Sequence, residues 1–200
     1  MIEPTKPPKI LSRYPFSDSR IQLVEGFSAY DGVIGDEPGA THKGIDYVLL
    51  IDGEYRSFDV FSMCEGTAFR GTSESWGEFV IVHLLSNEIR YSVVYAHLSE
   101  VESTIAPQLI ERDGQSVANE QGTHVSVGQR LGLTGTSGWT NGIIQLHLEL
   151  HQKELQTDVT QKLDPYGVYD RASSGRYPQP GAPLQGLEHA WVTDEPRLEL

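Results

Sequence analysis

The stretch IIQLHLELH, residues 143–151, decides the fold class of this chain. Within it, apolar residues alternate strictly with Gln145, His147, Glu149 and His151. Strict alternation is the period-two pattern of a half-buried β-strand, so these four polar side chains are predicted to share one face. Such a polar face is usually the solvated side of a sheet. The remainder of the chain must decide whether this one carries chemistry.

Short β-branched and aromatic runs recur along the chain, with turn residues between them and weak helical periodicity. The run YVLLI at 47–51 is followed by Asp52-Gly53, which is a favoured two-residue hairpin turn. Residues 79–98 contain two further runs around a polar turn, and residues 124–135 add more strands. The sequence therefore predicts an all-β protein built from antiparallel strands.

The chain is predicted to form one domain, residues 1–164, followed by a C-terminal tail, residues 165–200. Within the domain, residues 104–123 are polar and irregular, which favours a surface loop with at most one helical turn. The tail holds five of the eleven prolines, and we expect it to wrap the surface as coil.

Composition and charge exclude several classes of partner. A formal net charge of -13 and a pI near 4.8 argue against nucleic acid and anionic membranes, because like charges repel. Residues 1–10 hold three prolines and no apolar run, so they resemble neither a signal peptide nor a membrane span. We expect no membrane insertion and a monomer. The lone cysteine, Cys64, excludes an internal disulfide and a thiolate zinc site, and we expect it to be buried.

The segment THKGID, residues 41–46, offers a metal-binding pattern. His42 and Asp46 flank Gly44, and the glycine permits a bend that would turn both side chains toward one point. An imidazole and a carboxylate so placed form part of a three-ligand zinc site, which leaves the fourth position for water. His147 is the natural third ligand, since the alternation turns it to the polar face. A structural ion pair between His42 and Asp46 is the alternative explanation.

Five short motifs follow one another in chain order: HKGID, GEFVIVH, YAHL, VGQRLGLTGTSG and QLHLE. In this order they closely resemble the lysostaphin/LytM-type zinc endopeptidases, which cut the peptide cross-links of bacterial peptidoglycan. The resemblance covers residues 41–165. It implies an antiparallel β-sandwich called the duplicated hybrid motif, here with long loops and a coil-rich C-terminal tail. It also implies Zn2+ as the cofactor, a peptidoglycan peptide as the substrate and a location outside the cytoplasm.

The resemblance assigns roles to individual residues. His42 and Asp46 match the metal ligands of the family's first motif, and His147 matches the second histidine of its His-x-His motif, also a ligand. His97 matches the Tyr-x-His histidine, which in the family acts on the attacking water and stabilises the intermediate. His83 matches a common histidine without a catalytic role, so it is expected to be structural. Three histidines match no motif and are expected on the surface or in packing: His124, His151 and His189.

Gln145 departs from the family pattern. The segment QLHLE resembles the family motif His-Leu-His-Phe-Glu. The first histidine of that motif, which usually acts as the general base, is replaced by Gln145 in this chain. Glutamine forms hydrogen bonds but takes no proton near neutral pH. The pattern predicts that metal binding survives, that Gln145 holds the water and that activity is reduced. The long connection at 104–123 is a second departure and would reshape the substrate groove.

Two other functions stay open at this point. The chain could be a zinc-loaded but catalytically silent module that binds wall peptides or regulates another hydrolase. Phosphocarrier domains of sugar transport share the architecture, but they rely on a pair of histidines, and Asp46 beside His42 disfavours that function.

Overall fold

The computed structural model describes residues 8–27, 42–86, 88–112, 114–155, 160–167 and 177–198. The regular structure of these residues consists of β-strands alone, which confirms the predicted all-β class. None of the described segments forms a helix of the length and hydrophobicity that a bilayer crossing requires. The strands are β1 (Ile21–Glu25), β2 (Ile45–Ile51), β3 (Glu54–Arg56), β4 (Asp59–Phe61), β5 (Gly66–Ser73), β6 (Gly77–Ser86), β7 (Ile89–Val101), β8 (Leu109–Arg112), β9 (Gln115–Ala118), β10 (Thr123–Val125), β11 (Arg130–Thr134), β12 (Leu146–Glu154) and β13 (Thr160–Leu163).

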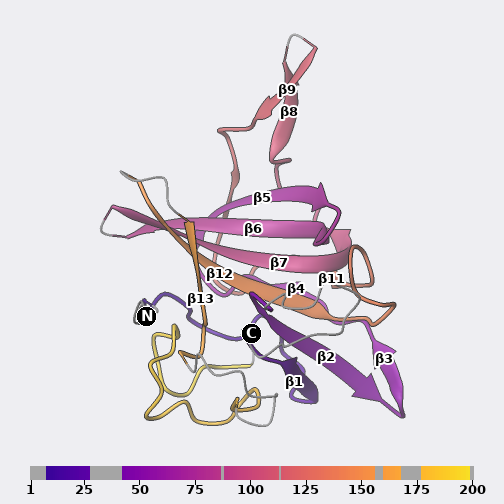
Figure 1. Cartoon of the computed structure of the whole chain (residues 1–200), viewed down its shortest axis with the longest axis vertical. Helices are drawn as coiled ribbons and strands as arrows, with labels where there is room; N and C mark the ends of the chain where they lie inside the picture. Colours follow the sequence, from indigo (N-terminus) through magenta and orange to yellow (C-terminus); the bar gives the residue numbers. More distant parts are fainter. Residues whose placement is uncertain are drawn as a thin grey trace.

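Eleven of these strands form one sheet with the central order β1-β2-β12-β7-β6-β5-β10 (Figure 1). Strands β3, β13 and β11 pair with β2, β12 and β7, and β4 pairs with β11. The strand pairs are antiparallel. Strand β12 thus lies between β2 and β7, and it carries the alternating stretch into the middle of the sheet.

Both predicted hairpins are confirmed. Strands β2 and β3 meet at Asp52 and Gly53, whose φ angles of 53° and 79° are those of a type I′ turn. Strands β6 and β7 form the second hairpin, with Ser86 opposite Ile89. With this register, β2, β6 and β7 place alternate apolar residues in the main core, whereas the three residues of β3 are exposed.

The polar face of β12 is buried. Leu146, Leu148 and Leu150 point into the main core as the alternation predicts. On the opposite face the side chains are almost as enclosed: Gln145 is 6% exposed, His147 7%, Glu149 2% and His151 9%. The usual interpretation of such a face as the solvated side of a sheet is therefore wrong here.

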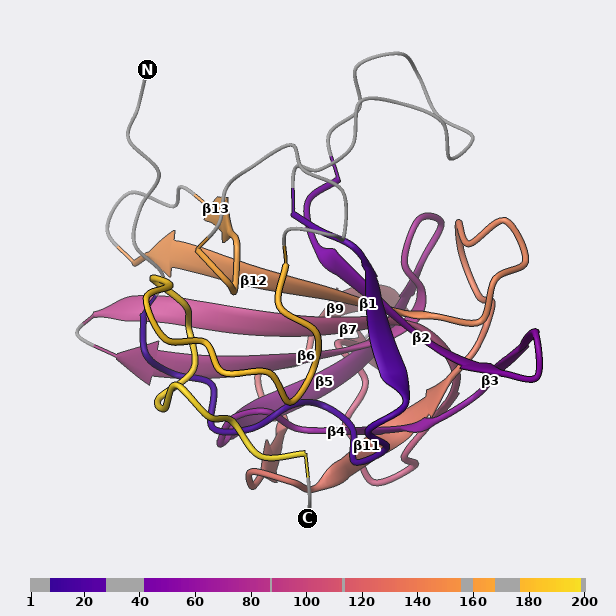
Figure 2. The ribbon, with the colours of Figure 1, turned by 90° about the horizontal axis from the view of Figure 1, so that it is seen from below.

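Apolar side chains pack against both faces of the sheet. The main core gathers residues from β1, β2 and β12, and the sheet curls so that Val60 of β4 and Leu131 of β11 join the same core (Figure 2). A smaller cluster contains Phe69, Phe79, Ile81, Val94 and Ala96, with Trp76 packed against it. Ala96 and Val94 pair with His147 and Glu149, and directly paired residues share a face. The smaller cluster therefore borders the polar side chains of β12.

Residues 104–123 differ from the expected irregular loop. Within them β8 and β9 pair as a hairpin that projects from the body of the molecule, at the top of Figure 1. The turn uses Gly114 with a φ of 75°, which only glycine adopts at low cost. The Asp-Gly sequence at residues 113–114 is a typical hairpin turn signal. The polar composition of the segment favoured a loop instead, so the hairpin was not predicted.

The described parts of the tail, residues 165–167 and 177–198, are coil as expected, but they contribute to the interior. Leu184, Ala190 and Trp191 are fully buried in the main core. Trp191 also forms a backbone bridge with Leu11, so the segments around these two residues lie side by side in the main core. Buried apolar area therefore places these side chains inside rather than on the surface.

Candidate metal and catalytic site

Three potential metal ligands converge where β2 and β12 run side by side. Asp46 on β2 is paired directly with His147 on β12, and His42 precedes β2 by one short bend. The Nδ1 atom of His147 lies 2.7 Å from Oδ1 of Asp46 and 3.1 Å from Nε2 of His42. The His42 Nε2 to Asp46 Oδ1 distance is 3.4 Å. Among the described residues, these three form the one His/Cys/Asp/Glu group compact enough to hold a metal ion.

Gly44 allows β12 to pack closely against the segment between His42 and Asp46, although its own backbone angles are ordinary. A Cβ atom at this position would lie 2.6 Å from Cε1 of His147 and 2.6 Å from the carbonyl oxygen of Leu148. Only a residue without a side chain lets β12 come this close. The glycine of the THKGID motif is thus required by the packing of His147, in addition to any bend it permits.

Hydrogen bonds on the outer side of each imidazole fix which nitrogen faces inward. Nδ1 of His42 lies 2.9 Å from the carbonyl oxygen of Gly26, and a carbonyl can only accept, so Nδ1 carries the proton. Nε2 of His147 lies 3.0 Å from Oε1 of the buried carboxylate Glu149 and donates to it. Nε2 of His42 and Nδ1 of His147 therefore face Asp46, and the proton that Nδ1 of His147 donates to this carboxylate is the one a metal ion would replace.

The three inward atoms fit a tetrahedral metal. Zinc bonds of about 2.0–2.1 Å to nitrogen and oxygen place neighbouring ligand atoms roughly 3.3 Å apart in a tetrahedral site. The three separations observed are 2.7, 3.1 and 3.4 Å. Imidazole and carboxylate are ligand types that zinc favours. Three acceptors that face one another require a positive charge between them, and a divalent cation meets that need.

The pKa values of His42, Asp46 and His147 also indicate that a positive charge is favoured between them. Burial opposes the charge on His147, but the carboxylates of Asp46 and Glu149 outweigh it and raise the pKa of His147 to about 9. Burial would also raise the pKa of Asp46, yet His42 and His147 hold it well below its ordinary value. For His42, the attraction of Asp46 exceeds the cost of burial and raises the pKa. In the metal-free protein a proton thus takes the position of the cation.

His97 lies beside this group in a strained backbone conformation. Its φ angle is 63°, and its ring centroid is 5.6 Å from that of His147. The His97 N–H donates to the carbonyl of Trp76 at 2.8 Å, and its own carbonyl accepts from the N–H of Gly135 at 2.8 Å. Nδ1 donates to the carbonyl of Ser137 at 2.8 Å, which leaves Nε2 as a basic nitrogen. Such over-determined strain is typical of functional residues.

The electrostatic surroundings keep His97 neutral. Burial, followed by the neighbouring charge of His147, lowers the pKa of His97 below its ordinary value. A neutral imidazole can accept a proton, whereas the imidazolium cannot. His97 is therefore suited to general-base chemistry next to the three ligands.

Gln145 occupies the end of the same strand face. Its N–H bonds to the carbonyl of Gly135 at 3.3 Å, and the two residues form a backbone bridge. Since Gly135 also donates to His97, one glycine holds the backbones of both residues at the same side of His147. The five residues that the sequence singled out, His42, Asp46, His97, Gln145 and His147, are thus brought to one region.

The remaining histidines lie elsewhere or in unexpected surroundings. Nδ1 of His83 bonds to Oγ of Ser92 at 2.8 Å. His124 is exposed, and His189 is buried beside Asp194. His151 is not a surface residue: its Nε2 lies 2.5 Å from Oε2 of Glu149.

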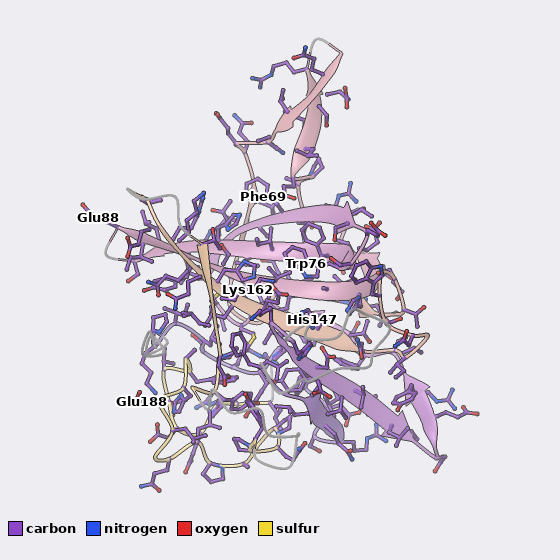
Figure 3. The ribbon with its side chains drawn as sticks, viewed as in Figure 1. Phe69, Trp76, Glu88, His147, Lys162 and Glu188 are labelled. Carbon is purple, nitrogen blue, oxygen red and sulfur yellow. The ribbon has the colours of Figure 1, made fainter. Side chains whose placement is uncertain are left out.

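Sequence reasoning missed the partners of Glu149. Its carboxylate lies 2.7 Å from Nζ of Lys162 on β13 and 3.3 Å from Nε1 of Trp76 in the β5–β6 turn. Figure 3 shows Trp76 and Lys162 beside His147 on one face of the sheet. The alternation placed Glu149 and His151 on this face, but nothing in the sequence linked Trp76 or Lys162 to them.

Comparison with known structures supports the fold. A structure of lysostaphin, the antimicrobial peptidase from Staphylococcus simulans, matches 85% of this chain and 60% of its own with a TM-score of 0.53 and 18% identity. LytU matches 76% of this chain and 84% of its own, with a TM-score of 0.45 and 19% identity. Csd3 of Helicobacter pylori matches 86% and 34%, with a TM-score of 0.47 and 20% identity.

These matches concern architecture. The chain spans 60% and 51% of the two lysostaphin chains that it matches. No protein-family model and no curated protein sequence matches it. The antiparallel fold of lysostaphin-type peptidases, implied by the five sequence motifs, is nevertheless the fold of this protein.

Proposed function

We propose that this protein is a zinc-dependent endopeptidase that acts on peptidoglycan peptides. The observation that carries the proposal is the convergence of three potential ligand atoms, from His42, Asp46 and His147, on one point of a buried strand face. The outer nitrogen of each imidazole is already bonded, so the ligands are held in place before a metal arrives. The lysostaphin-like fold supports a peptide substrate.

The residues around the three ligands have separate tasks. Nε2 of His42, Oδ1 of Asp46 and Nδ1 of His147 would hold the zinc, which when bound polarises a carbonyl and makes water more acidic. His97 would accept a proton at Nε2, because Ser137 occupies its Nδ1. Gln145 would orient the attacking water through its amide, without taking a proton.

A catalytically silent zinc-binding module is the second candidate, and Gln145 is the observation that favours it. A positioned general base typically contributes about 10²- to 10⁴-fold to rate, and the family resemblance places a histidine base at this position. A chain that lacks it could retain metal and wall-peptide binding without turnover. His97 supports turnover, because it combines a lowered pKa with a strained backbone beside the three potential ligands.

One experiment separates the two candidates. Purified protein is loaded with zinc, its metal content is measured, and it is incubated with purified peptidoglycan whose peptide ends are then read by mass spectrometry. New amino termini support the endopeptidase. Stoichiometric zinc with peptidoglycan binding and no new termini supports the silent module. Protein that takes up no zinc on reconstitution contradicts both.

A further inference from the structure

A buried carboxylate next to the ligands, that of Glu149, has four partners. Its Oε1 atom lies 3.0 Å from Nε2 of His147, 3.3 Å from Nε1 of Trp76 and 2.9 Å from Nζ of Lys162. Its Oε2 atom lies 2.5 Å from Nε2 of His151 and 2.7 Å from Nζ of Lys162. All four partners donate, so the carboxylate is fully engaged although it is almost inaccessible to water.

We propose that Glu149 is a positioning residue that holds His147 as an Nδ1 ligand, and that Trp76 and Lys162 hold Glu149 in turn. This inference rests on the proposed function, because it concerns how the zinc ligand is presented. Glu149 touches neither the substrate nor the three inward atoms. It acts through the far side of the His147 ring.

An imidazole offers two different nitrogen atoms to a metal. Either nitrogen of His147 could face Asp46, and a rotated ring would direct Nε2 inward instead. Because Glu149 lies two residues along β12, on the same face, its carboxylate accepts only from a nitrogen that points along the strand. The bond fixes both the tautomer and the ring orientation, and it makes Nδ1 a stronger donor to a metal.

Lys162 and Trp76 explain how a buried carboxylate persists at this position. An unpaired charge in such a site is strongly disfavoured, so Glu149 alone would be protonated or displaced. Lys162 supplies the opposite charge from β13 and also lies 5.6 Å from the Trp76 ring centroid, in a cation–π arrangement. Trp76, Lys162 and His147, which are labelled in Figure 3, all contact the Glu149 carboxylate.

Trp76 also connects the two functional histidines. Its indole N–H donates to Glu149, while its main-chain carbonyl accepts from the N–H of His97. One residue of the β5–β6 turn therefore supports the partner of His147 and the backbone of His97. A purely structural ion pair between β12 and β13 would need Lys162 and Glu149 only, and would leave the ring of His147 free to turn.

The test measures zinc binding and ligand geometry in Glu149→Ala and Glu149→Gln. Zinc affinity is determined by chelator competition near neutral pH, and nitrogen NMR of labelled histidine in the zinc-loaded protein identifies the coordinating atom. We expect Glu149→Ala to bind zinc about 10- to 100-fold more weakly, with a mixture of coordinating nitrogens. Glu149→Gln should lose less, because its amide oxygen still accepts from Nε2 of His147. The control is Glu154→Gln, which removes an exposed carboxylate from the end of the same strand.

Several outcomes decide the inference. Wild-type zinc affinity and a single Nδ1-bound His147 in a folded Glu149→Ala would overturn it. Should Glu149→Ala fail to fold, Glu149→Gln and Lys162→Met carry the decision, and unchanged affinity and coordination in both would overturn it as well. If the wild-type protein binds zinc and cleaves peptides, and the Glu149 variants match its zinc affinity and coordination, only this inference is contradicted. A wild-type protein that binds no zinc sinks the proposed function with it.

Discussion

Two groups of buried polar side chains share one face of β12, and they are built in opposite ways. In the ligand group, His42, Asp46 and His147, acceptor atoms are directed at one another. In the Glu149 group, which consists of Glu149, Trp76, His151 and Lys162, donors surround a single carboxylate. The first group depends on a proton or a cation at its centre, whereas in the second the donors already satisfy the carboxylate.

The difference is the physical reason why we propose the ligand group, and not the Glu149 group, as the binding site. A buried polar network that satisfies itself stabilises or positions, and it has no reason to recruit a ligand. A network whose lone pairs converge stays unfavourable until a cation or proton fills its centre. Burial and perturbed pKa values occur in both groups, so neither property alone would have separated them.

The largest effect should come from His147→Ala, which breaks both groups. Zinc content should fall from about one per chain to nearly none, because a three-ligand site has no spare donor. Stability should also fall by about 2–4 kcal/mol, since Asp46 and Glu149 both lose a hydrogen-bonded partner. Elemental analysis and urea denaturation measure the two effects. His124→Ala, at an exposed histidine, is the control and should retain both zinc and stability.

His97 gives the next largest effect, on rate rather than on binding. His97→Ala should lower peptide cleavage by about 10²- to 10⁴-fold while zinc stays bound. His97→Gly should be equally inactive but more stable than His97→Ala by about 1 kcal/mol, because the backbone φ of 63° suits glycine. Peptidoglycan digestion and thermal melts test the pair. Loss of zinc in either variant would move His97 into the ligand group.

A pH dependence should distinguish the metal-free protein from the zinc-loaded one. The pKa of His147 is raised from its ordinary 6.5 to about 9, so the folded state binds this proton more tightly than the unfolded state. The resulting stabilisation is present below pH 6.5 and is lost as the pH rises through about 9. The metal-free protein should therefore lose on the order of 1–3 kcal/mol over this window.

Zinc should remove that loss, because it replaces the proton at Nδ1 of His147. Urea denaturation across the pH range, with and without a chelator, provides the measurement. Asp46→Asn should flatten the metal-free curve, since it removes the carboxylate that raises the pKa of His147. If the unfolding free energies of the metal-free and zinc-loaded wild-type protein depend on pH in the same way, the ligand group is not the cause of the pH dependence.

The ligand group was predictable from the sequence, and the Glu149 group largely was not. Alternation fixed the direction of His147, and the THKGID spacing put His42 beside Asp46, so local patterns sufficed to predict that these three side chains converge. The donors to Glu149 come from a hairpin turn and from a strand that follows β12, at Trp76 and Lys162. The contact of Trp76 and Lys162 with Glu149 depends on the curvature of the sheet, which the hydrophobic periodicity of the sequence does not predict.

The same limit applies to the fold. Hairpins with Asp-Gly turns are local features, and the β2–β3 hairpin was predicted correctly. The burial of the polar face and the packing of Trp191 into the core depend on contacts between distant segments. Alternation says that two faces differ, but only the assembled molecule shows whether the polar one meets water.

The last prediction concerns Gln145, which lies on the opposite side of His147 from Glu149 along the same face. Gln145→His places an imidazole next to His97, whose backbone is held by the same glycine. If Gln145 merely replaces a lost base, this variant should cleave wall peptides at least about tenfold faster, with unchanged zinc content.

The opposite result would make Gln145 an adapted part of a working site. Gln145→His would then give no gain, and Gln145→Ala would lose activity that the parent protein already has. Comparison of the three proteins on one peptidoglycan substrate, at equal zinc loading, separates these outcomes. The expected change is the smallest of the set, because Gln145 alters proton transfer while the ligand group and the Glu149 group stay intact. A fast parent that both substitutions cripple would show that a glutamine amide, with His97 as the only base, is sufficient for this site.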